Sequence, residues 1–184
     1  DAEVPAEFVA EWEFVPLAPH GLAIFFFAAK GQNGEDIFDP GLPARDGSFA
    51  HYIHGAVKSY HVSYFANLPL YSSGRTLSNL RKNNHFFLLS QGPIAVTAAG
   101  ADAKSFPGSS MSPVNSQGFY RMTVCRKDQR IQVWCNDRIC IDFTDDQLER
   151  YGPPLGAGKI AFRQMSPTIA AYRNLRIWDV VKQK

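Results

Sequence analysis

Residues 59 to 87 read SYHVSYFANLPLYSSGRTLSNLRKNNHFF, and this stretch predicts two β-strands joined by a loop. Side chains alternate across a strand, so we expect His61, Ser63 and Phe65 to share one face of the first strand. Tyr60 and Tyr64 are expected on the opposite face. A strand with one polar and one apolar face is typical of an antiparallel sheet that packs one side on a core.

The second strand of this stretch has the same period. Arg75, Asn79 and Arg81 are expected to share its polar face with Leu77. Together with His61 of the first strand, they would put two guanidiniums, a carboxamide and an imidazole on one surface. Such groups bind an anionic, hydroxylated ligand through charge-assisted hydrogen bonds. The alternative is a solvated sheet face that binds nothing, and the sequence leaves it open.

The rest of the chain predicts strands and turns almost throughout. The strand-like runs are FVAEWEFVPL (8–17), LAIFFFAA (22–29), FFLLSQG (86–92), IAVTAAG (94–100), FYRMTVCRK (119–127), RIQVWCN (130–136), RICIDF (138–143), GKIAFRQM (158–165) and IAAYRNLRIWDVV (169–181). We expect LAIFFFAA and GKIAFRQM to lie inside a sheet. DDQLERYG (145–152) is the only helical candidate. Strands at such regular spacing predict an all-β, two-sheet antiparallel sandwich with little helix.

Length and composition exclude several classes of protein. The 184 residues suffice for one domain with a core, so we expect a single domain over residues 1–184. A net charge of +2, without Lys/Arg runs among aromatics, argues against nucleic-acid binding. No apolar run approaches the roughly 20 residues of a membrane-spanning helix. The three cysteines fit no zinc spacing, and their odd number leaves at least one free.

Five blocks of the sequence resemble the YesU-like family, long described as a domain of unknown function. They are FFFAAKGQNGEDIFDP (25–40), YHVSYF (60–65), RTLSNLRK (75–82), GKIAFRQM (158–165) and YRNLRIW (172–178). The resemblance implies a concanavalin-A-like jelly roll of two curved sheets whose concave face binds sugars. It also implies substrates among acidic polysaccharides of the pectic or ulvan type. Compared with the family, this sequence is expected to lack the first N-terminal strands.

A periplasmic or extracellular location is our expectation for a protein with such a partner, and a cytoplasmic location stays open. The first residues show neither the basic nor the apolar region of a signal peptide, so we expect that a leader has been removed or that the sequence starts late.

The chemistry that suits the polar surface is β-elimination from a uronic acid, either by a lyase that expels the C4 oxygen as a sugar or by a dehydratase that expels it as water. This reaction needs a group that neutralises the carboxylate, a base for the C5 proton and an acid for the leaving oxygen. His61 is the natural base, and Tyr64 is the candidate acid, provided that a β-bulge turns it to the same face. The remaining catalytic candidates are Arg75 and Arg81. The substrate-binding candidates are Asn79, Ser63, Lys82, His85, Arg163 and Gln164.

Two other functions stay open, and the chemistry requires no cofactor. Glu11 and Glu13 lie two residues apart on one strand face, within the separation of a hydrolase's paired carboxylates. A non-catalytic carbohydrate-binding module would need neither acid nor base. Asp36 and Asp39 are candidates for a structural Ca²⁺ site.

Overall fold

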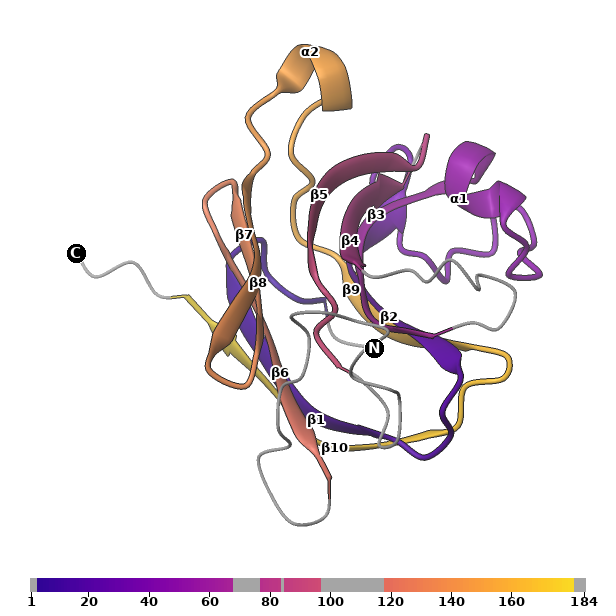
Figure 1. Cartoon of the computed structure of the whole chain (residues 1–184). Helices are drawn as coiled ribbons and strands as arrows, with labels where there is room; N and C mark the ends of the chain where they lie inside the picture. Colours follow the sequence, from indigo (N-terminus) through magenta and orange to yellow (C-terminus); the bar gives the residue numbers. More distant parts are fainter. Residues whose placement is uncertain (1–2, 68–76, 84, 97–117, 181–184) are drawn as a thin grey trace.

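The computed structural model of the chain describes residues 3–67, 77–83, 85–96 and 118–180. They form two five-stranded antiparallel sheets that face each other (Figure 1). The first, here called the β1 sheet, has the order β10 (Ala170–Asp179), β1 (Phe8–Pro16), β6 (Tyr120–Lys127), β7 (Arg130–Cys135) and β8 (Arg138–Thr144). The second, the β3 sheet, has the order β5 (Phe87–Pro93), β4 (Leu77–Asn83), β3 (Val57–Asn67), β2 (Gly21–Gly31) and β9 (Lys159–Met165). The predicted two-sheet sandwich is confirmed.

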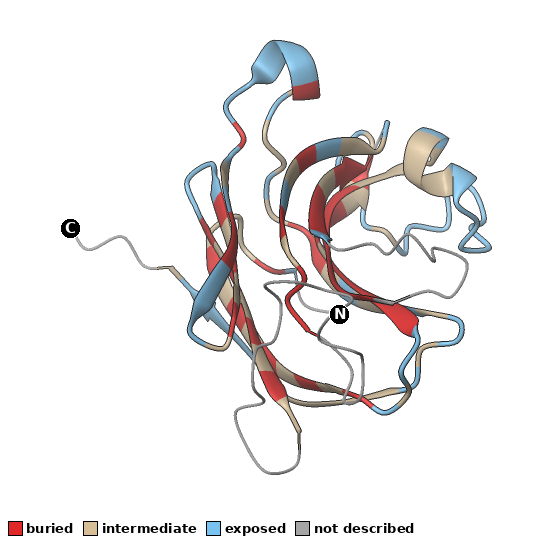
Figure 2. Cartoon of the chain, in the orientation of Figure 1, coloured by how far each residue is buried: buried red, intermediate tan, exposed pale blue. Residues whose placement is uncertain are grey.

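The core lies between the two sheets, as the buried residues in Figure 2 show. In β1 every second residue is buried, because its apolar side chains point inward and its polar ones outward. In β2 both faces are mostly buried, which fits its uninterrupted apolar sequence and its place inside the sheet. The expectation for GKIAFRQM was wrong, since β9 is the edge strand next to β2.

A register shift between β2 and β3 decides which side chains of β3 reach the outer face. Ala23 pairs with Phe65 and Ile24 pairs with Ser63, so β3 has one additional residue, Tyr64. The pairing of β2 with β3 therefore contains a β-bulge at this point. Phe65 therefore turns into the core beside Tyr64 instead of sharing the outer face with His61, contrary to the prediction from strict alternation.

The connection from β2 to β3 lies over the outer face of the β3 sheet and contains α1 (Ala50–His54) (Figure 1). Its Tyr52 ring stacks on Phe26 of β2, and Phe49 meets Phe86 edge to face. The sequence did not predict α1, because five residues without a side-chain cap carry little helical signal. The predicted helix near residue 148 is present as α2 (Leu148–Tyr151). No helix in the described ranges is long and apolar enough to span a membrane.

Candidate functional site

Antiparallel pairing aligns the polar residues of the β3 sheet in two neighbouring rows across its outer face. In the first row, His61 of β3 lies between Phe26 of β2 and Arg81 of β4. In the second row, the residues in order are Arg163, Ile24, Ser63, Asn79 and Gln91. The register therefore brings together side chains as far apart in the sequence as Ile24 and Arg163.

All residues of these rows except Phe26 and Gln91 line a cavity of about 170 Å³, here called the His61 cavity. Its lining residues are Leu22, Ile24, Phe49, Tyr52, His61, Ser63, Asn79, Arg81, Phe86, Arg163 and Met165. The Phe86 and Tyr52 rings form part of its wall. Each packs against a guanidinium, with Arg81 Cζ 4.2 Å from the Phe86 centroid and Arg163 Cζ 4.9 Å from the Tyr52 centroid. These cation–π contacts fix the direction of both arginines.

His61 is held in one orientation by its surroundings. Its ring lies among those of Phe26, Tyr52 and Phe86, with centroids 5.2 to 6.2 Å away, and only 4% of the residue is exposed. Nδ1 lies 3.0 Å from Oδ1 of Asn83, whose Nδ2 donates to Ser59 Oγ. With the carboxamide in this orientation Oδ1 accepts, so Nδ1 carries the proton and Nε2 carries the lone pair of the neutral ring.

The charges that line the cavity are positive. Arg81 Nη1 donates to the carbonyl of Phe86, and Arg163 Nη2 donates to the carbonyl of Gly47. Burial lowers the pKa of Arg163 from its ordinary value, although a guanidinium stays charged at any physiological pH. Among the described residues, no aspartate or glutamate lines the cavity. Guanidiniums in such a setting can bind an anionic, oxygen-rich ligand.

Two of the predicted binding residues complete the floor. Ser63 Oγ accepts a hydrogen bond from the backbone amide of Asn79. Asn79 Oδ1 accepts a hydrogen bond from Gln91 Nε2, so the side-chain Nδ2 of Asn79 is the donor that faces the cavity. Gln164 does not line the cavity. It follows Arg163 in β9, and neighbouring residues of a strand lie on opposite faces of the sheet. Arg75 lies outside the described residues.

Tyr64 is on the wrong side of the sheet for the predicted role. It is 1% exposed, its hydroxyl donates to Tyr172 Oη at 3.1 Å, and its ring contacts Trp12 between the sheets. Burial raises its pKa well above the ordinary value. The bulge at this position leaves Tyr64 in the core and turns Phe65 inward as well, so Tyr64 does not reach the outer face.

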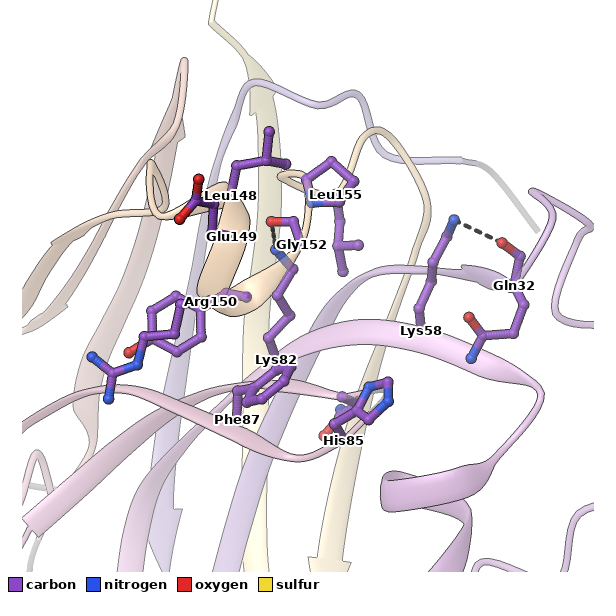
Figure 3. Close-up of a pocket in the computed structure, with 13 residues that line it drawn as sticks. Gln32, Lys58, Lys82, His85, Phe87, Leu148, Glu149, Arg150, Gly152 and Leu155 are labelled. Carbon is purple, nitrogen blue, oxygen red and sulfur yellow. Dashed lines mark hydrogen bonds between the residues drawn. The ribbon is translucent and has the colours of Figure 1, made fainter.

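Lys82 and His85 line a different cavity of about 480 Å³ near α2, here called the Lys82 cavity (Figure 3). Lys82 Nζ donates to Asp145 Oδ2 at 2.8 Å and to the carbonyl of Gly152 at 3.1 Å, and desolvation lowers its pKa. The exposed His85 ring stacks on Phe87. Lys82 is thus part of a buried ion pair and does not share the face of Arg81 with His61.

The acidic candidates also lie away from the His61 cavity. Glu13 and Glu11 are on β1 in the other sheet, where the Arg173 guanidinium accounts for the lowered pKa of Glu13, and Arg121 lies 3.9 Å from Glu11. Asp36 accepts from the amide of Phe38 and pairs with Lys159 at 3.2 Å, and Asp39 accepts from the amide of Gly41. The described residues contain no cluster of three or more metal-ligating side chains.

Tyr52, Phe86 and Asn83 are among the lining or supporting residues that the sequence did not assign to the site. Tyr52 belongs to the long connection, whose aromatic residues did indicate an ordered segment. Nothing in a local pattern shows which sheet face such a segment covers, so its residues could not be assigned to the site.

Comparisons with known proteins bear on the family and the fold. The family model described as "Domain of unknown function (DUF1961)" matches residues 1–177. The uncharacterized protein YesU of Bacillus subtilis is 34% identical over 179 residues, which cover 97% of this chain and 74% of that protein.

Solved structures give the same fold. A crystal structure of a Bacillus subtilis protein of unknown function with a galectin-like fold has a TM-score of 0.83 at 32% identity, and the match covers 99% of this chain and 76% of that one. Sheep galectin-11 has a TM-score of 0.52 at 6% identity, with 96% and 95% covered. The carbohydrate-binding module CBM66 of Bacillus subtilis has a TM-score of 0.51 at 11% identity, and the match covers 96% of this chain and 77% of that one. The sandwich is therefore a galectin-like jelly roll.

Proposed function

The chain belongs to the DUF1961 family, and we propose that it acts on acidic oligosaccharides, cleaving uronic acid units by β-elimination in the His61 cavity. The observation that carries the proposal is the composition of this cavity. Two guanidiniums, an imidazole, a carboxamide and a hydroxyl line it, and no described carboxylate does. A carbohydrate-binding module has the same fold, which supports sugars as the class of ligand.

The proposed reaction begins with the sugar carboxylate, which Arg81 and Asn79 hold with the help of Arg163. Neutralising this group makes the C5 proton more acidic, because the negative charge that develops on the carboxylate is stabilised. His61 Nε2 takes the proton. The C4–O bond then breaks, a C4–C5 double bond forms, and the leaving oxygen needs a proton.

Tyr52 replaces Tyr64 as the proposed acid. It lines the same cavity as His61, and the two ring centroids are 6.2 Å apart. A phenol is a hydrogen-bond donor that can also accept, so it suits a group that delivers a proton to the leaving oxygen. Tyr52 lies on α1, above the sheet, whereas His61 lies in the sheet floor. Because the two rings are in contact, a sugar in the cavity would meet both groups from the cavity side and would not lie between them.

The proposal is tested by ultraviolet absorbance of the unsaturated uronate, measured against a panel of acidic oligosaccharides. His61→Ala should lose about 10²- to 10⁴-fold in rate, because it lacks the base. Tyr52→Phe keeps the ring but loses the hydroxyl, and we expect a loss in the same range with nearly unchanged ligand affinity. His54→Ala is the matched control, since the exposed His54 does not line the cavity. Full turnover by His61→Ala would disprove its role.

A non-catalytic sugar-binding function is the second candidate, and the 4% exposure of His61 is the observation that favours it. A base must touch the proton that it removes, and three rings surround this imidazole. Calorimetric binding of a uronate without any absorbance change would favour this candidate. Hydrolysis has no support in the geometry, because Glu11 and Glu13 lie on the other sheet.

A further inference from the structure

A second cavity lies on the same face of the β3 sheet, on the other side of Tyr52. Its volume is about 220 Å³, and we call it the Ala161 cavity. Phe26 and Ala161 contribute apolar surface to it, and Ser59 and Asn83 line it with polar groups. Arg45 and Ser48 of the β2–β3 connection also line it.

Only a thin layer of side chains separates the Ala161 cavity from the His61 cavity. Tyr52 lines both. His61 of the first cavity is hydrogen-bonded to Asn83 of the second, with 3.0 Å between Nδ1 and Oδ1. Arg163 of the first is likewise hydrogen-bonded to the carbonyl of Gly47, which lines the second. The base and the acid of the proposed reaction thus stand at the partition between two cavities.

Each cavity is small for an oligosaccharide. Pockets that enclose drug-sized ligands measure roughly 300–1,000 Å³, so cavities of about 170 and 220 Å³ suit one sugar ring each. The Ala161 cavity has the mixed surface that a sugar ring needs, with apolar groups for its carbon–hydrogen face and hydrogen-bonding groups for its hydroxyls. The His61 cavity supplies the two arginines that suit a carboxylate.

We propose that the Ala161 cavity is the subsite for the sugar next to the uronate, so that the substrate has at least two units and the leaving group is a sugar hydroxyl, not water. This inference rests on the proposed function. In the step, His61 Nε2 takes the C5 proton, and the C5–H electrons form the C4–C5 double bond. The C4–O electrons stay with the leaving oxygen, which receives the Tyr52 proton. The products are an unsaturated uronate and a shortened saccharide, and no oxidant or metal enters the balance.

Ala161→Trp tests the inference, because Ala161 is exposed on β9 and lines the second cavity but not the first. Calorimetry with a monomeric uronate and a uronate-containing disaccharide gives the readout. The indole should fill the subsite, weaken disaccharide binding by about tenfold or more, and leave uronate binding within about twofold. Ala161→Ser, which adds one hydroxyl, is the matched control and should bind both ligands as the unsubstituted protein does.

The outcomes separate this inference from the proposed function. If the unsubstituted protein binds the disaccharide no more tightly than the uronate, or if Ala161→Trp weakens both equally, the subsite is disproved while the elimination site stands. If mass spectrometry finds a product of unchanged length that has lost one water, the leaving group is wrong. If no acidic saccharide binds at all, the proposed function itself fails.

Discussion

At the scale of single residues, the turn between β4 and β5 has an unusual backbone. His85 and Phe86 are consecutive non-glycine residues with positive φ, 90° and 61°. L-residues in this region carry strain of about 1–3 kcal/mol each, and such strain is often found at functional sites. Here it places the Phe86 ring against Arg81, His61 and Tyr52 and directs the Phe86 carbonyl to Arg81. The strained backbone thus contributes to the wall of the His61 cavity.

Replacing each of these two residues by glycine should have opposite effects on stability. His85→Gly relieves backbone strain and removes an exposed ring that stacks on Phe87. Because exposed contacts contribute little to stability, the free energy of unfolding should rise by about 1 kcal/mol. Phe86→Gly relieves similar strain but removes a half-buried ring with its contacts, so we expect a net loss of about 1 kcal/mol or more. Urea unfolding measures both. Phe86→Gly alone should also weaken uronate binding. Equal losses of stability in both variants would contradict this account.

At the scale of elements, a buried ion pair joins β4 to the segment after β8. Lys82 points from β4 into the space beneath α2, where Asp145 lies 1% exposed. The Tyr60 hydroxyl also donates a hydrogen bond to Asp145 Oδ2, and burial raises the pKa of Tyr60 far above its ordinary value. The group ties the β3 sheet to the β8–β9 connection, so it maintains the geometry of the sheet that carries the site.

Breaking this pair should cost far more than breaking an exposed one. Asp145→Asn leaves the Lys82 ammonium buried without its counter-charge, and the expected loss is about 3–5 kcal/mol in the free energy of unfolding. Asp142→Asn is the matched control, because Asp142 pairs with Arg130 on the exposed face of the β1 sheet. Its loss should be about 0–1 kcal/mol. Chemical denaturation of both variants measures the difference, and similar losses would show that the buried pair has no special role.

At the scale of the whole molecule, stability should depend on pH on the acidic side. Hydrogen bonds and ion pairs lower the pKa of several carboxylates, among them Glu13 through Arg173 and Asp142 through Arg130. A lowered pKa means that the carboxylate binds its proton at a lower pH in the folded state than in the unfolded state. The stability gained is present above the ordinary values, 4.5 for Glu13 and 3.8 for Asp142, and is lost as the pH falls through the lower folded-state values.

The melting temperature should therefore be constant near neutral pH and fall below about pH 4.5. Calorimetric scans from pH 7 to about pH 2 measure this profile. Glu13→Gln removes one of the responsible groups, so its acid-side decline should be shallower than that of the unsubstituted protein. A profile that is flat throughout, or a variant with an unchanged decline, would contradict the assignment.

The sequence by itself determined most of the strands, the sandwich and the polar face of the β3 sheet. The predicted strand IAVTAAG is not among them, because residues 94–96 form no named strand and 97–100 lie outside the described residues. These features depend on a local period of two residues, which is visible in any strand. The same period put His61, Ser63, Asn79 and Arg81 on one face, and the structure brings all four into the His61 cavity. Strict alternation also puts Lys82 on the opposite face of the strand from Arg81. The sequence alone therefore argued against assigning Lys82 to the same site.

Only the tertiary structure decided the rest of the site. The bulge that turns Phe65 inward arises from pairing with β2, about forty residues earlier in the chain. Tyr52 reaches the His61 cavity because its connection packs on the outer face through Phe26 and Phe86. Arg163 joins it from the far edge of the sheet through pairing with Ile24. Such contacts depend on the free energy of burying surfaces distant in sequence, and no local pattern contains that information.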